Sequence, residues 1–248
     1  MKLNLSPDNS VFTVINKIVD LMWLSILWSL IALPLFLAAL FVIFGFEDPG
    51  LLPIVALPIG CILIGPASAA LYYAVVKVIR RERGYATKCF FHSFKQNFKQ
   101  GVLSSLIYGL FVGILYVDLL LAPQTMQNQT VSSIFTGVLF VNAILALFIL
   151  TWLNPILSRF TVTLKELIKN SFVTAIRCFI RTFIMAAMWF GIGYVLWNYG
   201  GAYLTLLPFF LPGLSALIRS FIIEPVFKKL AGDQSEAEQN GVDAWYAE

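Results

Sequence analysis

Charged residues are so unevenly spaced in this sequence that they leave five long gaps. The gaps lie at 21–46, 49–76, 100–117, 119–158 and 182–218. Each is long enough for a membrane-spanning helix, which needs about 20 mostly apolar residues to cross the hydrocarbon layer. Only 12% of the residues are charged and 59% are hydrophobic, against about 25% and 45–50% in average soluble domains. This composition excludes a soluble enzyme and a nucleic-acid-binding domain.

The gap at 182–218 is too long for one helix. Asn198-Tyr199-Gly200-Gly201 supplies a turn signal in its middle, so we predict two helices there; without that turn the chain has five spans. The fold class we expect is all-α, a polytopic transmembrane helix bundle. The predicted single membrane domain, 1–230, has about six spans, at 21–45, 53–77, 100–118, 133–153, 182–198 and 203–223, and is followed by a disordered acidic tail at 231–248.

Basic residues occupy alternate segments of the chain. All 17 lysines and arginines lie within 2–17, 77–99, 159–181 and 219–229, and the opposite loops hold only acidic residues. By the positive-inside rule both termini are cytoplasmic, and six spans are favoured because five would place 219–229 outside. The three cysteines form no pair in an external loop, so we expect no disulfide.

The second predicted span is interrupted near its middle by Gly65-Pro66. A proline inside a helix removes one hydrogen bond and bends the helix. One interpretation is a broken helix whose freed backbone groups line a substrate site. The other is a kinked helix whose freed groups are satisfied by neighbouring helices. Small residues favour close helix approach, and the candidate kink and packing residues are Gly65, Pro66, Ala69, Gly191 and Gly193.

Few polar residues lie inside the predicted spans. Asn142, in the middle of the fourth span, is the candidate for a polar path. It either binds a substrate hydroxyl or joins two helices by a hydrogen bond. We interpret Arg219 and Glu224 as residues that flank the membrane interface. Without a buried carboxylate, a proton-driven pump is disfavoured, although a uniporter is not.

The loop at 77–99 ends in an amphipathic segment, in which phenylalanines at helical spacing run beside basic residues. This pattern predicts a helix lying at the surface of the anionic inner leaflet, with rings among acyl chains and ammonium groups among headgroups. The alternative is docking into a partner's groove. The candidate residues are Phe90, Phe91, Phe94, Lys95, Phe98 and Lys99. The loop at 155–181 has a related spacing of basic residues.

Signals of an enzyme are missing from the sequence. The single histidine, His92, has no cluster of metal-ligating residues around it, and no phosphate-binding glycine loop or nucleophile motif is present. We therefore expect no catalytic residue, no metal and no cofactor, and no nucleic acid as a partner.

Three local motifs occur together in the first half of the chain. They are GPASAALYY at 65–73, a basic helix end at 77–83 followed by Gly84-Tyr85, and FFHSFKQNFKQ at 90–100. In this combination the chain resembles the YesL family, uncharacterised bacterial integral membrane proteins, strongly over about 15–110 and more loosely to about 230. The resemblance implies a location in the bacterial cytoplasmic membrane and no established activity. Genes of that family tend to lie beside carbohydrate ABC importers and their sensor-regulator systems.

Three functions remain open from the sequence. The leading hypothesis is a non-enzymatic accessory or regulatory subunit that binds a carbohydrate ABC importer permease laterally. The alternative is a self-sufficient facilitator for a small neutral solute, with its path along Gly65-Pro66 and Asn142. A third interpretation makes the chain a membrane partner of a sensor kinase.

Overall fold

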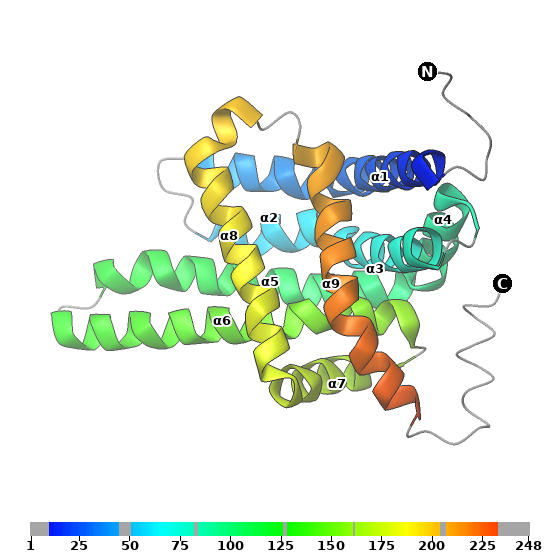
Figure 1. The fold of residues 1–248 in the computed structure, drawn as a ribbon. Helices are drawn as coiled ribbons and strands as arrows, with labels where there is room; N and C mark the ends of the chain where they lie inside the picture. Colours follow the sequence, from blue (N-terminus) through cyan, green and yellow to red (C-terminus); the bar gives the residue numbers. More distant parts are fainter. Residues whose placement is uncertain are drawn as a thin grey trace.

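The structure is a computed structural model that describes residues 10–44, 51–81, 84–125, 128–160, 162–203 and 207–232. Within these ranges every regular element is a helix, which confirms the predicted all-α class. The predicted tail at 231–248 lies outside the described residues beyond Gly232. In chain order the elements are α1 (Ser10–Phe44), α2 (Leu52–Cys61), α3 (Ile64–Ala74), the π-helix η1 (Val75–Arg80), α4 (Ala86–Gln96), α5 (Phe98–Thr125), α6 (Gln129–Arg159), α7 (Leu164–Arg177), α8 (Phe179–Tyr203) and α9 (Leu207–Gly232) (Figure 1).

Helices long and apolar enough to cross a membrane account for most of the described chain. Five stretches qualify by length and composition: Thr13–Leu35, Leu52–Arg80, Phe98–Leu121, Gln129–Arg159 and Phe210–Lys228. Helices α7 and α8, bent by 100° at their junction, make a sixth if the pair is one span. The chain is therefore a multi-pass membrane protein with five or six candidate spans.

The second span is broken as predicted, but the break lies a few residues before the predicted position, Gly65-Pro66. Helix α2 ends at Cys61 and α3 begins at Ile64, so the interruption is Ile62-Leu63. Pro66 falls in the first turn of α3. A proline is tolerated there because the first amide groups of a helix have no partner within it.

The predicted turn at 198–201 is also misplaced. Helix α8 continues through both glycines to Tyr203, and α9 begins at Leu207, so the separation falls later than expected. Glycine lowers helix propensity but does not by itself end a helix.

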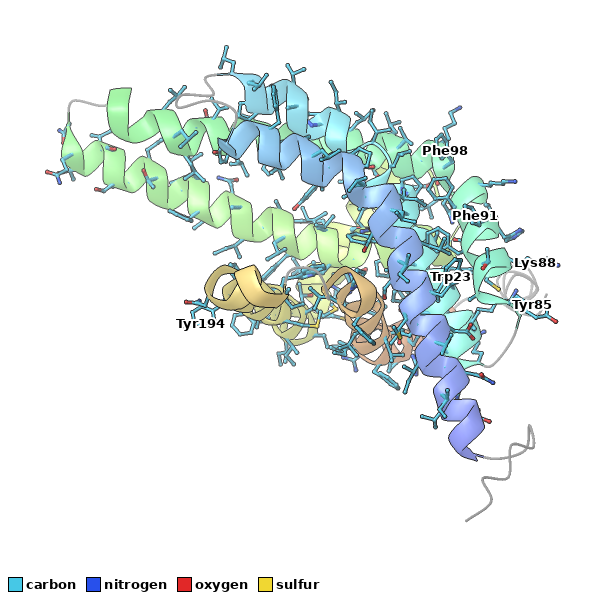
Figure 2. The ribbon with its side chains drawn as sticks, turned by 90° about the horizontal axis from the view of Figure 1, so that it is seen from above. Trp23, Tyr85, Lys88, Phe91, Phe98 and Tyr194 are labelled. Carbon is cyan, nitrogen blue, oxygen red and sulfur yellow. The ribbon has the colours of Figure 1, made fainter. Side chains whose placement is uncertain are left out.

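Helices α8 and α9 run across the other long helices. In Figure 1 they cross the direction of α5 and α6, and in Figure 2 they are seen almost end-on while α5 and α6 lie lengthwise. Helix α9 also packs on α1, where the Gly213 amide donates to Ser25 Oγ (2.9 Å). This crossing places the middle of α9 against α3, η1 and α6, where the candidate site lies.

The aromatic core lies at the same crossing. Trp152 of α6 and Phe227 of α9 are fully buried, with ring centroids 6.3 Å apart. The Trp152 indole donates to Thr182 Oγ1 (2.8 Å), which in turn lies 3.0 Å from the carbonyl oxygen of Ala175. One buried contact thus ties α6 to both sides of the α7–α8 bend.

Candidate functional site: a buried charge cluster

Glu224 on α9 is a buried carboxylate, only 3% exposed. Its Oε2 atom lies 2.8 Å from Arg159 Nη1 at the end of α6 and 3.8 Å from Arg81 Nη2. The Tyr72 hydroxyl of α3 donates to Oε1 at 3.4 Å. Ionisable groups inside a membrane protein are costly to bury and commonly mark functional sites. The expectation that the chain has no buried carboxylate is therefore wrong.

Two more arginines lie on α9 or contact it through neutral groups. Arg80 donates to the Ser220 carbonyl (2.7 Å), and its guanidinium lies 4.5 Å from the Phe221 ring centroid. Arg219, 7% exposed, donates to the Ser215 carbonyl (3.3 Å) and lies 5.3 Å from the Trp189 ring centroid. We name Glu224 and the residues that contact its carboxylate the Glu224 cluster; its members are Tyr72, Arg81, Arg159 and Glu224.

Arg80 and Arg81 lie at the end of a π-helical turn. Helix α3 becomes the π-helix η1 at Val75, and the Arg81 amide bonds to the Val76 carbonyl five residues back (3.1 Å). The wider turn rotates the following residues relative to a regular α-helix. Lys77 lies within it, 6% exposed, and donates to the Tyr73 hydroxyl (3.2 Å). Single π turns recur at functional sites, and nothing in the sequence pattern indicated this one.

The broken span is sealed by α5. The Gly65 amide donates to Ser105 Oγ (3.3 Å), and that hydroxyl also lies 3.4 Å from the Ile62 carbonyl oxygen. A Cβ atom added to Gly101 would lie 2.7 Å from Pro66 N. Gly65, Pro66 and Ala69 are all buried. These contacts match the interpretation of a kinked helix satisfied by its neighbours.

The other two predicted packing glycines behave differently. A Cβ atom at Gly191 or Gly193 of α8 would meet no atom within 4 Å, so neither packs inside this chain. Gly193 instead helps to line a shallow, mostly apolar groove between α6 and α8. The other lining residues are Leu147, Trp189, Phe190, Tyr194 and Asn198.

The predicted interfacial helix is shorter than expected and is only partly surface-exposed. Helix α4 ends at Gln96, so Phe98 and Lys99 belong to α5. Phe90 is fully buried, and the half-buried Phe94 packs on the same core. The remaining residues face outward: Phe91 and Phe98 are each 41% exposed and Lys95 is exposed. Figure 2 shows Tyr85, Lys88 and Phe91 along the outer side of α4.

Asn142 makes its hydrogen bond within its own helix. Its amide nitrogen donates to the Val138 carbonyl of α6 (2.9 Å). This bond is neither a substrate contact nor a bond to another helix, the two roles predicted for Asn142.

The described residues contain no group of three or more His, Cys, Asp or Glu placed to hold a metal ion. All three cysteines are free thiols, as expected. Burial raises the pKa of the Cys89 thiol in α4 above its ordinary value, although Lys77 and Lys88 oppose the shift. This thiol is held in its protonated, less nucleophilic form.

The comparison with known protein families matches less than half of the chain, in the part that contains the sealed break and η1. Residues 21–119 match a family described as protein of unknown function, DUF624. The matching segment runs from α1 into α5 and so includes Tyr72, Arg80 and Arg81, whereas Arg159, Arg219 and Glu224 lie beyond it. No curated protein and no solved structure matches the chain.

Proposed function

We propose that this chain is a non-enzymatic accessory or regulatory subunit of a carbohydrate ABC importer in the bacterial cytoplasmic membrane. It would bind the importer's permease side by side within the bilayer, through the outer face of α8. The observation that carries the proposal is the contrast between the sealed break at Ile62-Leu63 and the uncovered glycines of α8.

The α8 surface has the features of a helix-docking face. Gly193 allows a second backbone to approach closely, which is how membrane helices associate in the absence of a hydrophobic driving force. Phe190 and Tyr194, 60% and 68% exposed, lie within one turn of Gly193. The adjoining groove between α6 and α8 adds a concave apolar surface. A partner helix would fill this groove and cover Gly193.

The class of partner comes from the resemblance to the YesL family and from the gene neighbourhood of that family. The match to a family of unknown function over residues 21–119 is consistent with it and adds no activity of its own. That gene neighbourhood offers both a permease and a sensor kinase as partners. We favour the permease because the uncovered face lies on α8, which together with α7 makes the sixth candidate span.

The facilitator alternative gains no support from the described contacts. Ser105 occupies the backbone groups that a substrate would use at the break, and the Asn142 amide bonds to its own helix. Liposomes containing the purified protein should therefore show no flux of neutral sugars above protein-free liposomes.

The test is capture of the tagged protein from gently solubilised native membranes, with quantitative mass spectrometry of what co-purifies. The wild type should bring down a sugar-importer permease in near-equal amount, and Gly193→Phe should lose it. Gly137→Phe on α6 is the matched control, because a Cβ atom at Gly137 also meets nothing within 4 Å. A wild type free of any permease, or equal recovery by both variants, would refute the proposal.

A further inference from the structure

Helix α7 turns only one side toward the rest of the protein. Its buried residues recur every four positions and so lie along one side of the helix; they are Leu167, Ser171 and Ala175. Leu167 and Ala175 pack in the hydrophobic core. These contacts fix which side of α7 the protein covers and leave the other side for its surroundings.

The uncovered side of α7 carries an apolar row next to a basic row. Phe172 and Ile176 are 45% and 58% exposed, and residues four positions apart share a face of a helix. Lys165 and Lys169 are also exposed and have the same spacing. Because Lys169 comes three positions before Phe172, the two rows are neighbours on the helix surface.

The charge on this uncovered side is positive. The 14 residues of α7 contain one acid, Glu166, and three bases, Lys165, Lys169 and Arg177, and all four side chains are exposed. The Glu166 carboxylate already accepts hydrogen bonds from the amide and hydroxyl of Thr163. A surface that complements α7 is therefore apolar where it meets the rings and anionic where it meets the lysines.

Contacts with α6 place α7 at the edge of the membrane. Helix α7 follows the end of the candidate span Gln129–Arg159 and lies beside its last part (Figure 1). Its last turn reaches back to Trp152, since Thr182 Oγ1 accepts from that indole and lies 3.0 Å from the Ala175 carbonyl oxygen. Trp152 is about two turns before the end of α6, or about 10 Å along its axis. Interfacial helices insert their apolar face to about 5–10 Å.

The length of α7 agrees with this position. Its 14 residues make a helix of about 21 Å, too short to cross a hydrocarbon layer of about 30 Å. The sequence predicted an interfacial role for α4, but there Phe90 is fully buried and Phe94 packs on the core. The apolar row of α7 is the one that stays exposed.

We propose that α7 is an interfacial helix held by anionic phospholipids, on the side that the positive-inside rule assigns to the cytoplasm. Phe172 and Ile176 insert at the boundary of the acyl chains, and Lys165 and Lys169 contact lipid phosphate groups. This surface does not depend on the permease contact proposed for α8, and either can fail without the other.

Hydrogen exchange of the full-length protein in nanodiscs tests the proposal. The amides of residues 164–177 should exchange several-fold more slowly in discs that mix phosphatidylglycerol with phosphatidylcholine than in discs of phosphatidylcholine alone. Salt at about 1 M should remove the difference, because the Debye length is then about 3 Å. Equal exchange of this segment in the two kinds of disc would overturn the proposal.

Matched lysine variants locate the charged contact. Lys169→Gln should reduce the protection that phosphatidylglycerol adds to α7 about fivefold, since one base near an anionic surface contributes about 1 kcal/mol. Lys95→Gln removes the same charge from an exposed position on α4 and should leave the exchange of α7 unchanged. An equal loss of protection in both variants would overturn the proposal.

The apolar contact has a separate test. Ile176→Gln should speed the exchange of α7 in both kinds of disc, although glutamine is the better helix former, because the polar side chain opposes insertion. Unchanged exchange in this variant would count against insertion. If the wild-type segment is protected in native membranes but in neither kind of disc, a protein covers this face and the lipid proposal is refuted.

Discussion

The contact between α3 and α5 and the outer face of α8 both present glycines, yet only the first has a partner within the chain. At Gly101 an added Cβ atom would lie 2.7 Å from Pro66 N, whereas at Gly193 it would meet nothing within 4 Å. A glycine that meets a backbone is required by the fold. A glycine that meets nothing is free to serve a contact with another molecule, which is the basis of the function we propose.

The largest effect should come from the most enclosed group. Glu224→Gln removes the negative charge that Arg159 and Arg81 share, and leaving buried cations without it should cost about 3–5 kcal/mol of stability. The measurement is thermal or denaturant unfolding of the purified protein in detergent. A loss below about 1 kcal/mol would mean that the cluster is open to water rather than enclosed.

Glycine substitutions sharpen the comparison directly. Gly101→Ala forces a methyl group against the backbone of Pro66 and should cost about 3 kcal/mol. Gly193→Ala, in open space, should stabilise the helix by about 0.5–1 kcal/mol, because alanine is the better helix former. We expect the free energy of unfolding to fall in Gly101→Ala and to rise in Gly193→Ala. A change in the same direction in both variants would contradict the distinction between a packed and an uncovered glycine.

Ser105→Ala tests the seal at the broken span. Without the hydroxyl, the Gly65 amide loses its acceptor, and the expected cost is about 1–2 kcal/mol. Ser133→Ala is the control, because the Ser133 hydroxyl bonds only to the Gln129 carbonyl of its own exposed helix turn. Faster hydrogen exchange at residues 62–66 in Ser105→Ala alone would locate the effect at the break.

The smallest effect should appear at the exposed start of α7. Hydrogen bonds from the Thr163 amide and hydroxyl lower the pKa of Glu166 below its ordinary value of 4.5. Because the folded-state pKa is the lower one, this contribution to stability is present above pH 4.5 and is lost as the pH falls through the folded value. Glu166→Gln should therefore lower the stability slightly at pH 7 and flatten the acid side of the profile, so that unfolding curves of the wild type and the variant converge below the folded-state pKa.

Much of the architecture follows from the spacing of charged residues. Charge-free runs place the second to fourth spans inside α2–η1, α5 and α6, because a helix that crosses a membrane must keep its charges near its ends. The exact breaks do not follow in the same way. Proline is compatible with a first helical turn and glycine with a helix interior, so Pro66 and Gly200 each misplaced a boundary by a few residues.

The candidate site was hidden from the sequence for a different reason. The site combines residues that are far apart in the chain, Arg81, Arg159 and Glu224. In the sequence each has the features of an ordinary charged residue near a helix end. They meet only because α9 crosses α3 and α6, and no local pattern encodes that crossing. Phe90 shows the same limit, since helical spacing groups it with Phe91 while the fold buries one and exposes the other.

The most direct test of lateral association is photo-crosslinking from single positions in native membranes. A photoreactive amino acid placed at Gly193, and separately at Gly137, samples two uncovered helix faces with equal freedom. We expect position 193 to give one defined crosslinked product containing an importer permease and position 137 to give none. Crosslinks to the permease from 137 but not from 193, or to no protein from either position, would contradict the account.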